Sequence, residues 1–214
     1  TGLYTSPHLK DFRERIRVNG KMIPKEEVVS FVEKYKSRFE KIDLSFFEWT
    51  VGLAFYYFRK MKVDIAIIET GLGGRLDSTN VLIPEVSVIT NISYDHMNLL
   101  GNTLEKIAKE KAGIIKHDVP VVIGETQPEI TNVFISKAKS VKTSLLFADK
   151  RFAIRKWDVS EVPTPHVVCD VGGGNGFRIT LRCSLIGDYQ KKNFVTVVAV
   201  IDEMKRLGWN IDDL

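Results

Sequence analysis

The feature that most constrains the fold is an alternation of short β-branched apolar runs with longer segments of helical spacing. Strand-like runs lie at residues 63–68, 86–90 and 120–124, with a weaker one at 145–148. Helical patterns occupy residues 24–40, 46–62, 102–112 and 127–140. Such alternation predicts an α/β fold with a mostly parallel, doubly wound sheet, and the 63–68 run suits a strand buried on both faces.

The last third of the chain breaks this pattern. Residues 151–183 carry strand-like runs and a glycine-rich turn at 172–176, which predict a small antiparallel excursion, and residues 193–207 return to a helix. Asn19-Gly20 predicts a further hairpin near the N-terminus. Because 214 residues with 44% hydrophobic content suffice for one sizeable core, we expect a single domain over 1–214.

Composition excludes several classes of protein. The net charge is +4, but the basic residues are scattered, so nucleic-acid binding is not indicated. No apolar run approaches the roughly 18 residues of a membrane span, and the first residues do not form a signal peptide. The two cysteines, Cys169 and Cys183, match no zinc or redox spacing, which predicts a cytoplasmic protein. The chain lacks a starting Met, so we expect a piece of something longer.

Three polar positions follow predicted strands, where ligands gather in open α/β sheets. Glu69 comes directly after one strand, Asp95-His96 follows the next, and Lys111 lies one helix further on. A carboxylate at such a place can hold Mg²⁺, whereas an imidazole is a less usual Mg²⁺ ligand. Singly, each position also fits a plain role: a helix cap, a histidine hydrogen-bonded within the fold, or a solvated lysine.

The segment from Glu69 to Asn80 is rich in glycine and polar residues. Gly71, Gly73 and Gly74 allow a tight turn and the close approach of a ligand to the backbone. The segment matches neither common phosphate-binding glycine pattern, and a plain turn is an equal alternative.

Ser6 and the pair Phe46 and Phe47 can each be interpreted either as ligand-binding residues or as purely structural ones. Ser6 supplies a hydroxyl for a metal or a phosphate, although capping a turn is the commoner use. Phe46 and Phe47 offer rings on which a flat ligand can stack, although their spacing favours packing in the core.

Taken together and in order, these motifs resemble the folylpolyglutamate synthase and dihydrofolate synthase family of the Mur ligase superfamily. The matching stretches are residues 2–9, 14–20, 47–48, 69–80, 89–96, 100–103 and 107–116, with a weaker echo at 185–208. The resemblance implies the P-loop-type central ATP-binding domain of that family. It also implies that the first strand and phosphate loop, and the C-terminal glutamate-ligase domain, lie outside these 214 residues.

The resemblance implies a role for each candidate residue. Ser6 and Glu69 look like ligands of one Mg²⁺, and His96 like a ligand of a second, with Asp95 orienting it. Lys111 matches a lysine that the family carries as a carbamate, which would make it a carboxylate-like metal ligand. Glu69, His96 and Lys111 would thus form the catalytic group.

The resemblance also implies the substrate contacts. Phe47, Asp77 and Ser78 fall where the family holds the pterin ring, and Asn193 matches its nucleotide-contacting asparagine. Tyr189 replaces a usual histidine, which leaves the adenine side less defined.

The implied activity is ATP-dependent ligation of L-glutamate to dihydropteroate or reduced folates through an acyl phosphate, by a cytoplasmic monomer without nucleic-acid or membrane partners. A Mur-type cell-wall ligase, a nucleotide kinase and a non-catalytic fragment that binds pterin or metal are the alternatives. Because a phosphate loop normally supplies the backbone N–H groups that hold phosphates, we expect the isolated chain to be inactive.

Overall fold

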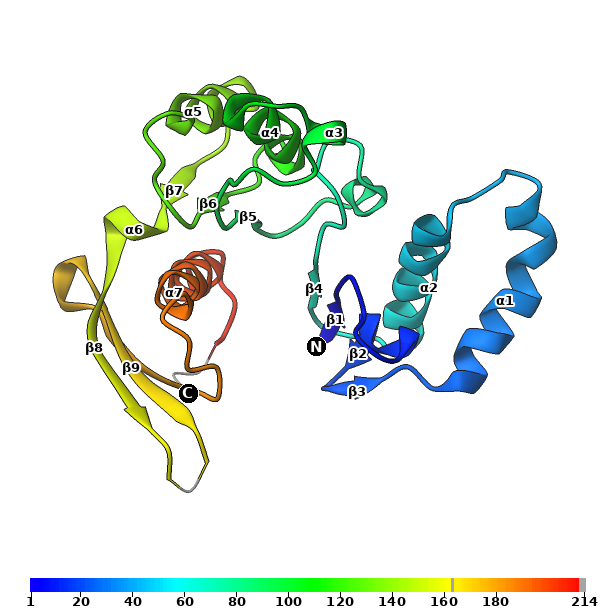
Figure 1. Cartoon of the computed structure of the whole chain (residues 1–214), viewed down its shortest axis with the longest axis horizontal. Coiled ribbons are helices and arrows are strands. Elements are labelled where there is room, and N and C mark those ends of the chain that lie inside the picture. The colour runs from blue at the N-terminus through cyan, green and yellow to red at the C-terminus, as the bar shows by residue number, and fades with distance from the viewer. Residues whose placement is uncertain (163, 212–214) are drawn as a thin grey trace. The chain divides into compact units, whose positions relative to one another are not determined.

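The structure is a computed structural model that describes residues 1–162 and 164–211. Its contacts divide the chain into two compact units, Thr1–Leu82 and Ile83–Leu214 (Figure 1). Each unit has its own hydrophobic core. The single domain expected over 1–214 therefore stays a prediction. None of the described helices is long and apolar enough to cross a membrane.

Unit 1 is built on a mixed sheet. Its strands are β1 (Gly2–Tyr4), β2 (Ile16–Val18), β3 (Lys21–Met22) and β4 (Ala66–Ile68), in the order β3-β2-β1-β4. β1 pairs in parallel with β4 and antiparallel with β2. The hairpin expected at Asn19-Gly20 is confirmed between β2 and β3, where both residues have positive φ, 49° and 78°.

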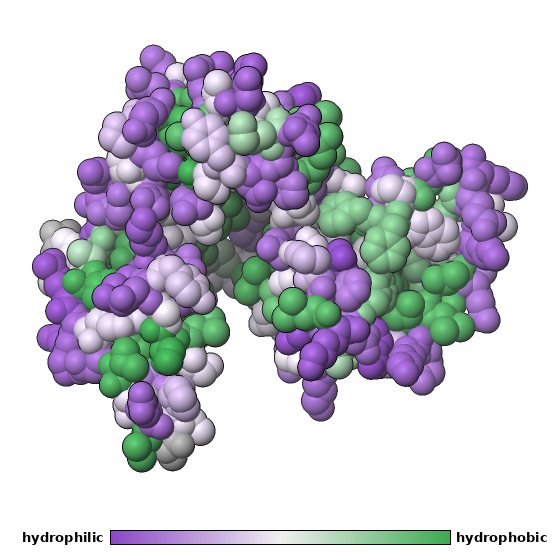
Figure 2. Space-filling view, viewed as in Figure 1, coloured by the Kyte–Doolittle hydropathy of each residue, from purple (hydrophilic) through white to green (hydrophobic). Residues whose placement is uncertain are grey.

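Both helices that the periodicity predicts in this unit are present, and they pack against each other. α1 spans Lys25–Glu40, directly after Pro24, and α2 spans Phe46–Lys60, with Ser45 and Glu48 forming a reciprocal capping box. Their facing aromatic rings pack at mutual centroid distances from 4.7 to 6.4 Å; they belong to Phe31, Tyr35, Phe39, Trp49 and Tyr56. The aromatic pattern of these segments thus serves mainly the core. An apolar groove of about 420 Å³ remains between the two helices, where hydrophobic residues reach the surface (Figure 2).

The strand expected at 63–68 differs from the prediction. Only Ala66–Ile68 form a strand, and the side chain of Ile67 is 59% exposed. The expectation of burial on both faces is therefore wrong here. Within the described residues, β4 is the edge strand of its sheet and pairs only with β1, which leaves its other edge uncovered.

Unit 2 contains the wholly parallel sheet of the α/β fold. β5 (Ser87–Ile89), β6 (Val121–Ile123) and β7 (Leu145–Phe147) form a parallel sheet in the order β5-β6-β7. α5 (Thr131–Ser140) packs on β7 and α7 (Gln190–Arg206) packs on β6, from opposite sides of the sheet (Figure 1). The remaining helical elements are α3 (Met97–Leu100), α4 (Leu104–Lys111), η3 (Ala112–Ile114) and α6 (Ala148–Arg151).

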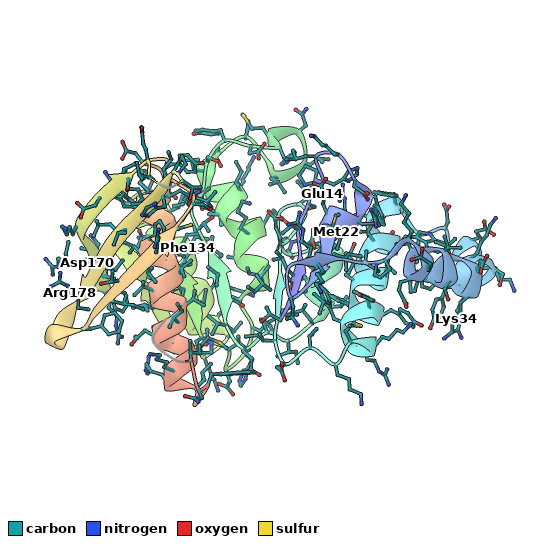
Figure 3. The ribbon with its side chains drawn as sticks, turned by 90° about the horizontal axis from the view of Figure 1, so that it is seen from below. Glu14, Met22, Lys34, Phe134, Asp170 and Arg178 are labelled. Atoms are coloured by element: carbon teal, nitrogen blue, oxygen red, sulfur yellow. The ribbon has the colours of Figure 1, made fainter. Side chains whose placement is uncertain are left out.

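The antiparallel excursion is confirmed. β8 (Phe152–Ser160), β9 (His166–Gly173) and β10 (Arg178–Cys183) form a sheet in the order β10-β9-β8, with the 3-10 turn η4 (Gly174–Gly176) between the last two strands. Val167, Cys169 and Val171 lie in one core with residues of α7. Asp170 of β9 lies near Arg178 (Figure 3). It accepts hydrogen bonds from Arg178 and Thr180, which hold the pKa of its carboxyl below the usual range.

Candidate active site

Ser6 and Glu69 meet at one end of the unit 1 sheet. Because Tyr4 of β1 pairs in parallel with Ile68 of β4, the residues after these strands leave the sheet at the same end. The Ser6 N–H donates to Glu69 Oε2 at 2.7 Å, and the Glu69 N–H donates to the Tyr4 carbonyl at 2.9 Å. Ser6 Oγ and Glu69 Oε1 hydrogen bond to no other residue of the described part of the chain. The backbone hydrogen bond therefore brings Ser6 and Glu69 together, and each has a side-chain oxygen that remains available.

Of the glycines after Glu69, one allows the turn and another leaves space for the Phe47 ring. Gly73 has a φ of 65°, which favours glycine. A Cβ on Gly71 would lie 2.2 Å from Cζ of Phe47, so the close approach at this position is to the protein's own side chain. Phe47 also lies 6.2 Å, centroid to centroid, from the ring of Tyr4.

The Asp77 carboxylate is engaged within its own segment. It is buried, and one oxygen accepts the Leu72 N–H at 2.8 Å. The other accepts the N–H and the hydroxyl of Thr79, at 2.9 and 2.5 Å, and so caps the 3-10 turn η2 (Ser78–Val81). Since a carboxylate has about four acceptor positions, Asp77 retains room for one further donor. Ser78 is half-buried at the start of η2.

His96 of unit 2 has an unusual backbone. Its φ is 49°, in the left-handed region, and it directly precedes α3. The Asp95 carboxylate accepts the His96 N–H at 2.8 Å and lies 3.6 Å from its Nε2. Backbone in this sparsely populated region is a recurrent mark of functional sites. Five other non-glycine residues of the described chain share a positive φ, so the backbone alone does not single out His96.

Lys111 and Asn193 are also in unit 2. Lys111 is half-buried at the C-terminal end of α4, and it forms no ion pair within the described residues. Asn193 is exposed on the first turn of α7, where its side-chain amide donates to Gln190 Oε1 at 2.8 Å. The structure therefore groups the candidates as Ser6 with Glu69, Phe47 with the 69–80 segment, and Asp95 with His96.

Residues 24–201 match the Mur ligase middle domain. The chain belongs to the Mur ligase middle-domain family. A dihydrofolate synthase/folylpolyglutamate synthase of Bacillus subtilis is 49% identical over 90% of this chain and 46% of its own length. A folylpolyglutamate synthase of Lacticaseibacillus casei is 37% identical over 92% of this chain and 47% of its own length.

Solved structures agree with these relatives. The apo form of the L. casei folylpolyglutamate synthase has a TM-score of 0.90 and 35% identity, covering 99% of this chain and 53% of that one. A complex of folylpolyglutamate synthase with AMPPCP and folate gives the same TM-score, identity and coverage. The family resemblance and the α/β fold are therefore confirmed. This Mur ligase middle domain spans about half the length of the curated relatives it matches.

The oxygens of Ser6 and Glu69 are of the type that Mg²⁺ prefers. Within the described residues, no three His, Cys, Asp or Glu side chains gather into a metal cage. Mg²⁺ needs no such cage, because it commonly binds one or two protein oxygens and keeps waters and substrate phosphates as its other ligands. Ser6 Oγ and Glu69 Oε1 meet that requirement.

The sequence analysis missed a group of residues that organises the Ser6 segment of the Mur ligase domain. Glu14 accepts backbone hydrogen bonds from that segment, which hold the pKa of its carboxyl below the usual range. Tyr4 is fully buried beneath Phe47, and burial raises its pKa to about 12. The pattern Asp11-x-x-Glu14 is a capping-box signal that could have revealed part of this arrangement.

Proposed function

We propose that the full-length protein joins L-glutamate to folate-type acids, at the expense of ATP and through an acyl phosphate. The observation that carries the proposal is the Ser6–Glu69 pair, with two available oxygens at the carboxyl ends of two parallel strands. The proposal is also supported by the membership of the chain in the Mur ligase middle-domain family and by its similarity to relatives described as folylpolyglutamate and dihydrofolate synthases. A related structure binds AMPPCP, an ATP analogue, together with folate.

Within this proposal, Ser6 and Glu69 would hold one Mg²⁺ and His96 would hold a second, with Lys111 as a further metal ligand. Lys111 acts as a carbamate, and its lack of an ion-pair partner among the described residues leaves the amine open to that modification. Bound Mg²⁺ neutralises phosphate charge as it develops. Asp95, next to the imidazole, would orient the His96 ring toward the second Mg²⁺.

The substrate side uses Phe47, Asp77 and Ser78. The half-buried Phe47 ring offers an edge or face to a pterin, and Asp77 has one acceptor position left for a ring N–H. Asn193, exposed at the start of α7, contacts the nucleotide.

In the reaction, the carboxylate of the folate-type acid attacks the γ-phosphorus of ATP and ADP leaves, which gives an acyl phosphate. The glutamate amine then attacks the acyl carbon, the amide bond forms, and phosphate and a proton are released. Ser6 and Glu69 position the γ-phosphate for the first step, so that catalysis there is mainly alignment and charge neutralisation.

The compartment, the partners and the oligomeric state of the protein are also proposed. The described residues carry two free cysteines and no membrane-spanning helix, which suits a protein that works in the cytoplasm. We propose that its partners are ATP, glutamate and dihydropteroate or a reduced folate, and that it acts as a monomer. The 214 residues alone are expected to be inactive.

The decisive assay is ATP-dependent addition of glutamate by the full-length protein, with dihydropteroate and with reduced folates as parallel substrates. Glu69→Ala should lower kcat/KM by roughly a hundredfold or more, because a metal ligand contributes several kcal/mol to the transition state. Glu33→Ala, on the exposed face of α1, is the matched control and should leave kcat/KM unchanged. Ligation that persists at the wild-type rate in Glu69→Ala would remove the metal role.

A further inference from the structure

The loop that carries Ser6 has little burial to hold it in place. This Ser6 loop, residues 5–11, connects β1 to the 3-10 turn η1 (Phe12–Arg15). Leu9, the one aliphatic side chain in the loop apart from the Pro7 ring, is 91% exposed. Since loops with few buried contacts open easily, the position of Ser6 depends on polar contacts.

Glu14 supplies three of these contacts. Its carboxylate accepts the backbone N–H groups of Leu9 and Lys10, both at 3.0 Å, and of Asp11 at 2.8 Å. Glu14 lies on η1, in unit 1 (Figure 3). Because an ionised acceptor makes stronger hydrogen bonds than a neutral one, a single side chain fixes three consecutive backbone groups.

Arg15 holds the same loop at two other points. Its carbonyl accepts the Thr5 N–H at 3.0 Å, and its Nε donates to His8 Nδ1 at 2.9 Å. The Arg15 side chain is buried beside the Phe46 ring and has no carboxylate partner among the described residues. Ser6 thus lies between two anchored residues, Thr5 and His8, and its own N–H reaches Glu69.

We infer that Glu14, assisted by Arg15, is a positioning residue that presents Ser6 to Glu69 and so sets the affinity of their shared cation site. No hydrogen bond joins Glu14 to Ser6 or Glu69 in the described part of the chain, and Glu14 acts through the backbone of the Ser6 loop. The inference rests on the proposed function insofar as the cation is Mg²⁺ bound with ATP. The ordering of the loop itself does not depend on that function.

The first test is hydrogen exchange of the Ser6 loop in the full-length protein. Glu14→Ala removes three acceptors at once, so the amides of Leu9, Lys10 and Asp11 should exchange at least about tenfold faster than in the wild type. Glu14→Gln keeps one carbonyl oxygen and should give an intermediate rate; it also serves if the alanine variant does not fold. Glu33→Ala is the control of equal charge change and should leave these rates unaltered.

The second test separates positioning from general stability. The Mg²⁺ concentration for half-maximal ligation, and the KM for Mg–ATP, should rise roughly three- to tenfold in Glu14→Ala, and added Mg²⁺ should restore most of kcat. Direct Mg²⁺ titration by calorimetry should show the same weakening. Faster exchange throughout unit 1, or a wild-type Mg²⁺ dependence with a loosened loop, would overturn the inference.

These outcomes are distinguishable from failure of the proposed function. If Glu69→Ala retains full ligase activity, the metal role of the Ser6–Glu69 pair is wrong whatever Glu14 does. If Glu69→Ala is inactive while Glu14→Ala matches Glu33→Ala in Mg²⁺ dependence, the function stands and the positioning role fails.

Discussion

Replacing Asp77 tests whether its carboxylate serves the protein, a ligand or both. Asp77→Ala removes three hydrogen bonds, one from Leu72 and two from Thr79. Bonds to a charged acceptor contribute roughly 1.5–3 kcal/mol each, but two of these go to one residue and are not additive. We therefore expect Asp77→Ala to lower the free energy of unfolding by about 3 kcal/mol. Asp77→Asn retains one acceptor oxygen and should cost about 1–2 kcal/mol.

The assay is urea unfolding of the full-length protein, followed by a signal from unit 1, with the KM for dihydropteroate measured on the same variants. A stability loss in Asp77→Asn with an unchanged KM assigns the carboxylate to the turn alone. A loss of stability together with a raised KM assigns it to both tasks. A stability change below about 0.5 kcal/mol in Asp77→Ala would refute the reasoning from its hydrogen bonds.

The remaining predictions concern two buried aromatic side chains. Tyr4 Oη is buried and makes no hydrogen bond of ordinary geometry in the described residues, although the Arg15 guanidinium is close enough to lower its pKa. Tyr4→Phe should therefore change the free energy of unfolding in urea by less than about 1 kcal/mol, and a larger loss would show that Arg15 holds the hydroxyl. Because the pKa of Tyr4 is raised to about 12, the wild type should also lose stability as pH rises from about 10 toward 12, and Tyr4→Phe should lose this part of the pH dependence. Phe134 lies in α5 with 2% of its surface exposed (Figure 3), so Phe134→Ala should cost about 3–5 kcal/mol. The neighbouring Ile135→Ala, at an exposed position of the same helix, should cost under about 1 kcal/mol, and equal losses in the two variants would contradict the assigned burial.

The sequence predicted best the elements that depend on local periodicity. α1 begins directly after Pro24, and β6 is buried along its whole length, as its apolar run indicated. The prediction of burial on both faces failed for residues 63–68, because an apolar run indicates a strand but does not show which other elements pack against that strand. β4 pairs with β1 alone among the described strands, and β1 itself, three residues long with a glycine, gave no strand pattern.

In the candidate site, too, local features could be predicted from the sequence, whereas contacts between distant residues could not. Glu69 could be placed by its position after an apolar run, but its partnership with Ser6 required the parallel pairing of β1 and β4, which connects residues 63 positions apart. The part played by Glu14 could be predicted only in part, from the Asp11-x-x-Glu14 capping-box pattern. Its bonds to Leu9 and Lys10 go to backbone N–H groups, which every residue except proline possesses, so these two recipients carry no signature in the sequence.

The contact between Gly71 and Phe47 has a consequence for how this segment can evolve. Gly71 does not have a positive φ, so what excludes a larger residue there is the Phe47 ring rather than the backbone. The two positions should therefore change together among relatives: alanine or serine at position 71 becomes acceptable only where position 47 carries a smaller or differently placed side chain. The glycine at position 71 is therefore required by the size of the side chain at position 47 and not by the conformation of a turn.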